Sequence, residues 1–406
     1  MIRICAVTVG RSDWGILRPV LDAIRSDPEF QLHLVASGAH LATGHGDSLK
    51  SIIDDGYAVD DQVEMLLSSD SPAAIARSMG IGTAAFADVF RRANPDVLLL
   101  LGDRFEMHSA AVAAVPFRIP IAHLHGGEVT EGAIDDVFRH AITKYSHLHF
   151  VSTEEHRRRV VQLGEEPWRV TICGAPALDN LKTLKLLSRE SLSELTGLSM
   201  EVPPVLCTIH PVTLQYDRTS EQLDEVLTAL AEISAPIIMT RPNADTCNHQ
   251  IVHRMEQFAE LHSNVRLLRN LGTQCYFSLM QIASAMVGNS SSGIIEAASF
   301  GLPVVNIGIR QSGRPRSGNV IDVECRADQI RNAMQRAMSS EFREQVAQNV
   351  TNVYGDGRAA DRIVTVLRNH ACNERLLVKK FFDLAEYRAS NQVPGARHEF
   401  EDRAVA

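Results

Sequence analysis

Short runs of consecutive apolar residues alternate along the chain with longer stretches that have the periodicity of amphipathic helices. In the first half, IRICAVTV precedes the helical stretch ILRPVLDAIRS, and DVLLLLG precedes FEMHSAAVAAV and then IPIAHLH. The second half repeats this order with the runs PVLCTIH, APIIMT, NVRLLR, AMVG and LPVVNIG. Because the runs are continuous rather than alternating, they indicate strands buried on both faces of a parallel sheet. The pattern therefore predicts an α/β fold with two Rossmann-like, doubly wound domains that face each other across a cleft.

The domain boundary is predicted from a polar break in this pattern. We expect a first domain over residues 1–185 and a second over residues 200–370, because residues 185–204 are polar and end in Pro-Pro. The remainder, 371–406, is predicted to hold one more helix, NERLLVKKFFDLAEY, and a disordered tail from Arg388. Ligands of such folds bind beyond the carboxyl ends of the strands, so functional residues are expected there.

Composition limits the partners. The 406 residues carry a net charge of −9, which argues against general nucleic-acid binding and requires local positive groups for any anionic ligand. The seven cysteines are scattered without a CxxC pair, which is typical of reduced thiols in the cytoplasm. No signal peptide is expected, and no apolar run approaches the roughly 18 residues of a spanning helix. We therefore expect a cytoplasmic enzyme without a membrane partner.

Two loops of the second half have the residues of a diphosphate site. VGNSSSGIIEAASFG places Ser290 and Ser291 between a strand and a helix, where free backbone N–H groups favour an anion. The alternative is a serine N-cap with Glu296 in the first turn. As a ligand contact, Glu296 would accept hydrogen bonds from ribose hydroxyls. In GIRQSGRPRSGN, the arginines 310, 314 and 316 suit phosphate oxygens, or form a solvated basic loop.

Further polar residues follow other predicted strands. Arg11 comes after the first strand, which lacks GxGxxG and so gives no support for a dinucleotide site. Asp103 and Arg104 follow another strand, although Asp103 could simply cap the next helix. His210, Asn243 and Asp245 follow strands of the second half. Each of these residues fits a structural role by itself, but together they would converge on one cleft.

The stretch HLHGGEVTEGAIDDVFRH, residues 123–140, has the densest chemistry. We expect His123 and His125 to share one strand face, and Gly126-Gly127 to let the backbone approach a ligand closely. A helix follows, in which Asp135 pairs with Arg139 and Asp136 with His140 four residues on, either at a site or as surface ion pairs. Its buried stripe is predicted to consist of Ile134, Val137, Phe138, Ala141, Tyr145 and Leu148. The histidine spacing fits no standard metal site, so no metal is expected.

These motifs resemble one known family. Through GRSD, GDRFE, HGGEVTEGAIDDVFRHAITK, HPVT, GNSSSG, RQSGR and YGDGRA, the chain is similar to the hydrolysing UDP-N-acetylglucosamine 2-epimerases of sialic and legionaminic acid biosynthesis. The resemblance extends to about residue 385 and implies the GT-B architecture. It implies nucleotide contacts from Arg11, Arg104, Asn243, Ser290, Ser291, Glu296 and Arg310. It places His210 near the diphosphate, as both a catalytic and a UDP-binding candidate, and Asp103, His123, Asp135 and Arg139 around the sugar.

Two positions depart from that family. His125 stands where the non-hydrolysing branch and the animal enzymes have glutamate, and Leu101 stands where animal members have histidine. His125 is therefore itself a candidate acid or base.

The resemblance implies conversion of UDP-N-acetylglucosamine and water to N-acetylmannosamine and UDP. Departure of UDP makes the C2 hydrogen removable, so anti elimination to 2-acetamidoglucal would precede hydration. Inversion at C2 needs acid/base groups on two faces of the sugar, which explains the dense set of Asp and His residues. We expect no cofactor, and a homo-oligomer, either a dimer or a tetramer.

Several alternatives stay open. The first is the same reaction on UDP-2,4-diacetamido-2,4,6-trideoxyglucose, the substrate of a legionaminic acid pathway. The others are a non-hydrolysing epimerase, a GT-B glycosyltransferase and a catalytically inactive nucleotide-sugar sensor.

Overall fold

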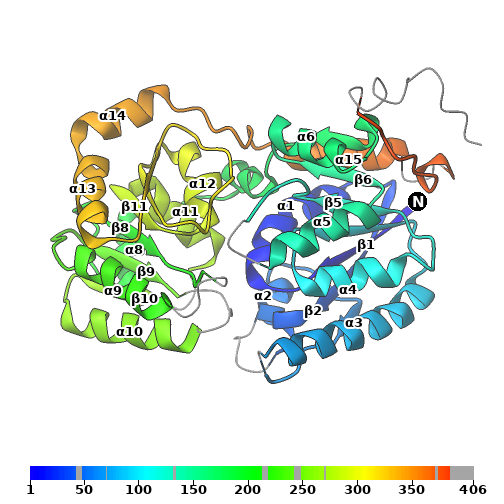
Figure 1. Cartoon of the computed structure of the whole chain (residues 1–406), viewed down its shortest axis with the longest axis horizontal. Coiled ribbons are helices and arrows are strands. Elements are labelled where there is room, and N and C mark those ends of the chain that lie inside the picture. The colour runs from blue at the N-terminus through cyan, green and yellow to red at the C-terminus, as the bar shows by residue number, and fades with distance from the viewer. Residues whose placement is uncertain are drawn as a thin grey trace, which may run out of the picture.

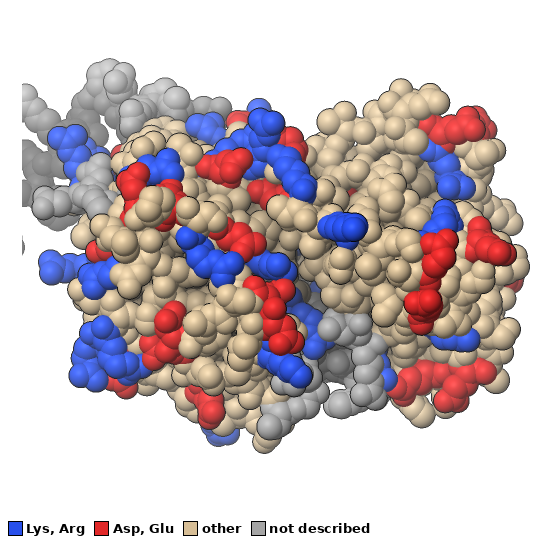
Figure 2. Space-filling view, turned by 180° about the vertical axis from the view of Figure 1, so that it is seen from behind, with Lys and Arg blue, Asp and Glu red and all other residues tan. Residues whose placement is uncertain are grey.

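The computed structural model describes residues 1–42, 48–69, 71–130, 134–212, 218–241, 248–268, 271–370 and 374–384. Figure 1 shows two lobes side by side, each a sheet with helices on both faces. Acidic and basic residues are interspersed over both lobes on the face shown in Figure 2, as a modest net charge would suggest.

The first lobe contains a seven-stranded parallel sheet in the order β3-β2-β1-β4-β5-β6-β7. Its strands are β1 (Ile2–Thr8), β2 (Phe30–Ser37), β3 (Asp61–Val63), β4 (Val97–Leu101), β5 (Ile121–Leu124), β6 (Leu148–Val151) and β7 (Val170–Ile172). The connecting helices are α1 (Arg11–Ser26), α2 (Ser48–Asp54), α3 (Pro72–Ala93), α4 (Phe105–Ala114), α5 (Asp135–Tyr145) and α6 (Glu154–Gln162). All five residues of β4 are buried, as the continuous apolar run predicts.

The second lobe contains a six-stranded parallel sheet in the order β10-β9-β8-β11-β12-β13. Its strands are β8 (Val205–Thr208), β9 (Ile237–Thr240), β10 (Val265–Leu268), β11 (Ala285–Gly288), β12 (Val304–Ile307) and β13 (Val320–Val323). Its helices are α9 (Thr219–Leu230), α10 (Asn248–Leu261), α11 (Gly272–Ile282), α12 (Ser291–Ile295), α13 (Ala327–Met338) and α14 (Ser340–Asn349). The predicted pair of doubly wound α/β domains is confirmed.

The chain crosses between the lobes twice, which differs from the predicted boundaries. The first crossing lies between α7 (Asn180–Thr183) and α8 (Arg189–Thr196), a helix inside the expected polar break whose Leu192 joins the second lobe's core. After α14 the chain returns, and α15 (Ala359–His370) packs against α1 in the first lobe (Figure 1). Ile363 and Leu367 of α15 belong to the first core, because their apolar face fits α1 rather than the second sheet.

The helix predicted over residues 373–387 is absent from its described part. A short 3₁₀ turn spans Glu374–Leu376, and the chain then continues without helix to residue 384. Arg169, which is 1% exposed, donates to the carbonyls of Leu376 (2.9 Å) and Val378 (2.8 Å). These carbonyl groups therefore accept hydrogen bonds from a buried guanidinium, whereas in a helix they would accept from backbone N–H groups. The predicted tail from Arg388 lies outside the described residues.

Candidate active site

Each sheet reverses its strand order at one point, and most of the predicted site residues follow the strands there or next to them. In the first sheet the order reverses between β1 and β4, which precede Arg11 and Asp103, and β5 lies next to β4. In the second sheet it reverses between β8 and β11, which precede His210 and Ser290. Such reversal points are where ligands of open α/β sheets bind.

Two arginines connect these regions across the lobes. The guanidinium of Arg314, after β12, donates to the Glu128 carboxylate at 2.7 Å and contacts the Thr130 hydroxyl at 3.4 Å. Arg159 of α6 donates to the carbonyl of Gly313 at 3.2 Å. The loop after β12 therefore lies against the loop after β5.

The loop after β4 places Asp103 beside a buried arginine. Arg139 of α5 is 2% exposed and pairs with Asp103 and with Asp136, the latter at 3.3 Å. Helix α4 has Arg104 as its N-cap residue, so the alternative role of Asp103 as a cap is excluded. Arg104 pairs with Glu106, a fully buried carboxylate, at 3.3 Å. The carboxylate of Asp103 is therefore partly exposed and is bound by the guanidinium of Arg139.

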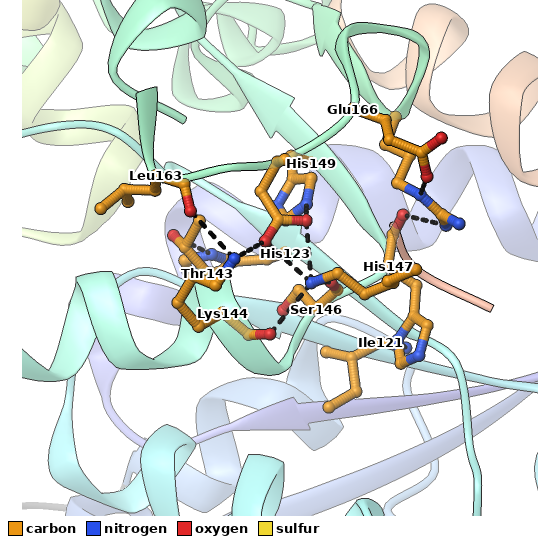
Figure 3. A network of polar contacts seen from close by, with 12 residues as sticks. Ile121, His123, Thr143, Lys144, Ser146, His147, His149, Leu163 and Glu166 are labelled. Carbon is orange, nitrogen blue, oxygen red and sulfur yellow. Dashed lines mark hydrogen bonds and ion pairs between the residues drawn. The ribbon is translucent and has the colours of Figure 1, made fainter. Parts of the chain in front are cut away.

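His123 lies behind this loop. It is fully buried, and its Nε2 is 2.7 Å from the Gly102 carbonyl. Its Nδ1 is 3.3 Å from the hydroxyl of Thr143, and both residues are labelled in Figure 3. Burial lowers the pKa of His123 to about 3, so the ring is neutral at pH 7. Both ring nitrogens have protein partners, and one of them anchors the residue before Asp103.

His125 has a different environment. Strand β5 ends at Leu124 and His125 has φ +64°, so the prediction that it shares a strand face with His123 is wrong. Its Nδ1 lies 2.5 Å from Glu128, whereas its Nε2 is buried without a hydrogen-bond partner among the described residues. An imidazole with one nitrogen fixed by a carboxylate and the other bare is suited to proton transfer.

The Gly-Gly pair allows close packing inside the first lobe. A Cβ on Gly127, which has φ +74°, would lie 2.3 Å from the His156 carbonyl. A Cβ on Gly126 would lie 3.2 Å from the His123 ring. The close approach that these glycines allow is therefore to α6 and to His123.

The buried face of α5 agrees only in part with the predicted stripe, of which Tyr145 packs against the core and Leu148 is buried at the start of β6. Ile134 and Val137 are 49% and 71% exposed, whereas Arg139, Ile142 and Thr143 are the buried residues of the helix. The buried Arg139 pairs with Asp103, and Ile142 joins the hydrophobic core of the first lobe. The predicted pair of Asp136 and His140 is confirmed at 3.4 Å. Arg139 reaches Asp136, and Asp135 is half-buried at the first position of the helix.

His210 and its neighbours form a tight backbone clamp in the second lobe. Asn289 accepts from the backbone N–H of His210 at 2.7 Å and donates to its carbonyl at 2.8 Å. Arg310 donates to the Asn289 carbonyl at 3.2 Å. Burial lowers the pKa of His210 well below its usual value, with the Arg310 charge adding to this. A cavity of about 670 Å³ opens beside His210 and Asn289.

The serine loop combines a cap with a buried acid. The Ser290 hydroxyl accepts from the Ser292 N–H at 3.4 Å, so this serine is an N-cap, and Ser291 is the first residue of α12. Glu296 is the C-cap residue of that short helix, not part of its first turn as predicted. It is 7% exposed and burial raises its pKa to about 7. Its electrostatic neighbours include His125 of the other lobe.

The remaining predictions have mixed outcomes. Arg11 begins α1. Burial, with the charge of Arg11 adding to it, lowers the pKa of His40 to about 4. Of the three loop arginines, Arg314 reaches Glu128, and Arg316 pairs with Asp322 at 3.2 Å, so neither points freely toward a diphosphate as expected. Asn243 and Asp245 lie outside the described residues. In the described ranges no three His, Cys, Asp or Glu side chains are grouped as metal ligands would be.

Comparison with known proteins identifies the architecture. The model of one protein family, described as UDP-N-acetylglucosamine 2-epimerase, matches residues 22–368. The chain belongs to this family. Its fold is the two-domain GT-B type, as predicted. A Neisseria meningitidis UDP-GlcNAc 2-epimerase structure with bound UDP-GlcNAc has a TM-score of 0.77 at 18% identity, covering 91% of this chain and 100% of that one. A Methanocaldococcus jannaschii epimerase with UDP-GlcNAc and UDP has a TM-score of 0.76 at 16% identity, with the same coverage.

Sequence relatives within the family carry different substrate names. The chain is 37% identical over 384 residues to a Campylobacter jejuni GDP/UDP-N,N'-diacetylbacillosamine 2-epimerase (hydrolyzing), covering 94% of this chain and 99% of the relative. It is 35% identical to the Legionella pneumophila UDP-N,N'-diacetylbacillosamine 2-epimerase (hydrolyzing), covering 93% and 99%. It is 30% identical to a Neisseria meningitidis UDP-N-acetylglucosamine 2-epimerase, covering 95% and 100%.

Sequence reasoning missed two acids of this epimerase fold. Asp13, in the first turn of α1, is 9% exposed, and burial raises its pKa to about 6; Arg104 and His125 are among its electrostatic neighbours. Glu128 is 2% exposed and binds both His125 and Arg314. The position of Asp13 just after a strand end was a signal for it. Glu128 had no such signal, because its partner Arg314 is 186 residues away.

No helix in the described ranges is long and apolar enough to cross a bilayer.

Proposed function

We propose that this chain is a hydrolysing 2-epimerase that converts a nucleotide-activated 2-acetamido sugar and water into the free C2 epimer and the nucleoside diphosphate. One observation carries the proposal. Two acid/base groups, Asp103 and His125, follow the neighbouring strands β4 and β5, next to the loop that meets the second lobe. Inverting C2 requires proton transfer on two faces of one carbon, and two such groups can supply it.

The reaction has two steps under this proposal. The C1–O bond to the diphosphate breaks and a base takes the C2 proton, which leaves the 2-acetamidoglucal and the nucleoside diphosphate. Water then adds at C1 while a proton returns to the opposite face of C2. Arg310 and the serine loop stabilise the leaving diphosphate, and Glu296 accepts hydrogen bonds from the ribose.

The first-lobe residues divide into two groups in this mechanism. Asp103, His125 and Asp135 are assigned to proton transfer and sugar binding. His123 is assigned a positioning role, because its two nitrogens contact Gly102 and Thr143 and its low pKa keeps it neutral. Arg139 holds the Asp103 carboxylate.

The identity of the sugar is proposed from the sequence motifs and the relatives. The sequence motifs favoured UDP-N-acetylglucosamine, which is the substrate named for the relative at 30% identity. The relatives at 37% and 35% are named for diacetylbacillosamine, which is 2,4-diacetamido-2,4,6-trideoxyglucose. Similarity therefore favours the diacetamido sugar, with UDP-N-acetylglucosamine as the second candidate.

One labelled reaction tests the activity and the substrate together. The protein is offered UDP-N-acetylglucosamine and the UDP- and GDP-linked diacetamido sugars, in D₂O and separately in ¹⁸O-water. We expect the manno epimer with one deuterium at C2, and ¹⁸O at C1 rather than in the nucleotide, detected by NMR and mass spectrometry on rapidly quenched samples. The preferred sugar is the one with the highest kcat/KM.

The other products are equally informative. A gluco sugar that keeps its C2 hydrogen would indicate simple hydrolysis and refute the epimerase. ¹⁸O in the nucleotide would indicate attack on phosphorus. The absence of turnover with all three nucleotide sugars would also contradict the proposal.

A further inference from the structure

The Glu128 carboxylate joins a candidate catalytic group to the second lobe. One of its oxygens lies 2.5 Å from His125 Nδ1, and the other accepts from Arg314 at 2.7 Å. The side chains of Glu128 and Arg314 are 3% and 8% exposed. One buried carboxylate therefore links His125 to the loop after β12.

The same guanidinium also touches the network of Asp103. Thr130 contacts Arg314 at 3.4 Å and accepts from Arg139 at 2.9 Å, and Arg139 pairs with Asp103. Arg314 thus reaches the supports of both proposed acid/base groups from the opposite lobe. A purely structural contact would not need to touch both.

Burying these charges is costly, which sets this pair apart from a surface ion pair. Desolvation penalises both ions, and only close pairing offsets it. Although burial favours protonated Glu128, the nearby His125 and Arg314 hold the pKa of Glu128 far below its usual value. The carboxylate is therefore charged, and accepts a hydrogen bond from Nδ1 of His125. That leaves Nε2 bare, and Nε2 is the buried ring atom without a partner among the described residues.

We propose that Glu128 and Arg314 are an inter-lobe positioning pair for His125, which fixes its ring and tautomer only when the loop after β12 lies against the first lobe. This inference rests on the proposed function. Neither residue touches the substrate; Glu128 acts through His125, and Arg314 acts through Glu128 and Thr130. Arg314 is therefore assigned to coupling the lobes instead of binding the diphosphate.

The pair also sets the charge around His125. The groups that interact with it are Asp13 of α1, His123 of β5, Glu128 in its own loop, His156 of α6 and Glu296 of the second lobe. Removing the Arg314 charge leaves Glu128 free to stabilise protonated His125. Removing the Glu128 charge has the opposite effect, because Arg314 then repels a protonated ring.

The test compares pH profiles of kcat for Arg314→Gln and Glu128→Gln, with UDP affinity measured separately. We expect each variant to lose about 10–100-fold in kcat while UDP affinity changes little, as for other residues that orient a catalytic group. The acidic side of the profile should move in opposite directions in the two variants, to higher pH in Arg314→Gln and to lower pH in Glu128→Gln. Arg314→Lys should keep the normal profile, because it keeps the charge.

Two further variants distinguish a positioning role from a purely structural one. The double variant Glu128→Gln/Arg314→Gln buries no lone charge, so it should fold, and its kcat loss should match one single variant rather than the product of both. Arg159→Gln, which removes the other inter-lobe arginine without touching Glu128, should keep the normal pH profile.

The outcomes separate this inference from the proposed function. If the unaltered protein has no epimerase turnover, the proposed function fails. If it turns over but both profiles shift in the same direction or stay in place, or the losses multiply, the positioning pair is refuted. A large loss of UDP affinity in Arg314→Gln would return this arginine to the diphosphate.

Discussion

Two carboxyl groups at the site are buried where their charged forms are disfavoured. Asp13 and Glu296 are 9% and 7% exposed, and burial raises their pKa values to about 6 and about 7. Each has one oxygen without a hydrogen-bond partner among the described residues. Buried acids with raised pKa values are typical of functional sites. A bound ligand can supply the hydrogen-bond partner that the carboxyl oxygen lacks in the ligand-free protein.

Replacement of Glu296 should therefore stabilise the ligand-free protein at high pH. Because the folded pKa is raised from 4.5 to about 7, the unfolded state releases this proton more easily. Stability is thus lost as pH rises between these values, and Glu296→Gln avoids that loss. We expect the variant to gain a few kcal/mol over the unaltered protein at pH 8 and little at pH 4. Thermal unfolding at both pH values measures this, with Glu344→Gln, an exposed carboxyl on α14, as control. A gain of equal size at both pH values would contradict it.

At the scale of elements, the serine loop combines two roles that can be separated. Ser290 caps α12, whereas the Ser291 hydroxyl has no capping role in that helix. Ser291→Ala should weaken UDP binding by about 1–3 kcal/mol, the cost of an unpaired buried group, with the melting temperature unchanged. Ser290→Ala should weaken binding and also lower stability by about 1 kcal/mol. Titration calorimetry in excess EDTA measures the UDP affinity of both variants, because UDP is expected to bind without metal. Thermal unfolding measures their stability. Normal affinity in both variants would leave the loop a cap only, and loss of all binding in EDTA would contradict a metal-free site.

The sequence predicted those strands that are continuous apolar runs, such as β1, β4 and β8, because such a strand is specified by its own buried residues. It did not predict β3, β6, β7 and β13. The sequence predicted less about elements whose conformation depends on contacts with residues far away in the chain. The apolar residues of α5 predicted one buried face, but the structure also buries Arg139, which pairs with Asp103 from the preceding loop. The residues 374–384 have a helical composition, yet Arg169 takes their carbonyls. Arg314 looked like a phosphate ligand because its partner, Glu128, is nearly half the chain away.

At the scale of the whole molecule, the chain returns from the second lobe and its last described segment packs onto the first. Beyond α15, Lys379 lies 2.8 Å from the fully buried Glu165, which also binds Lys144 at 2.6 Å and His149 at 3.1 Å. Lys144 and His149 are labelled in Figure 3. Although burial opposes ionisation, His149, Lys144 and Lys379 lower the pKa of Glu165 to about 2. Lys379 of the last described segment therefore helps to neutralise the buried Glu165 carboxylate inside the first lobe.

Removing that lysine should weaken the first lobe without changing the site. Lys379→Gln leaves Glu165 with fewer cationic partners, so we expect the free energy of unfolding to fall by about 2 kcal/mol at pH 7. Because the folded pKa of Glu165 is depressed from 4.5 to about 2, its contribution is complete above pH 4.5 and disappears as pH falls through 2. The difference between variant and unaltered protein should therefore shrink toward pH 2. Lys380→Gln, an exposed neighbour, is the matched control and should have no effect. UDP affinity, measured on folded protein, should stay normal in both variants, because the hydrogen bonds that Lys379 makes to described residues all lie in the first lobe. Equal unfolding energies for the two lysine variants would mean that the segment beyond α15 does not stabilise the fold.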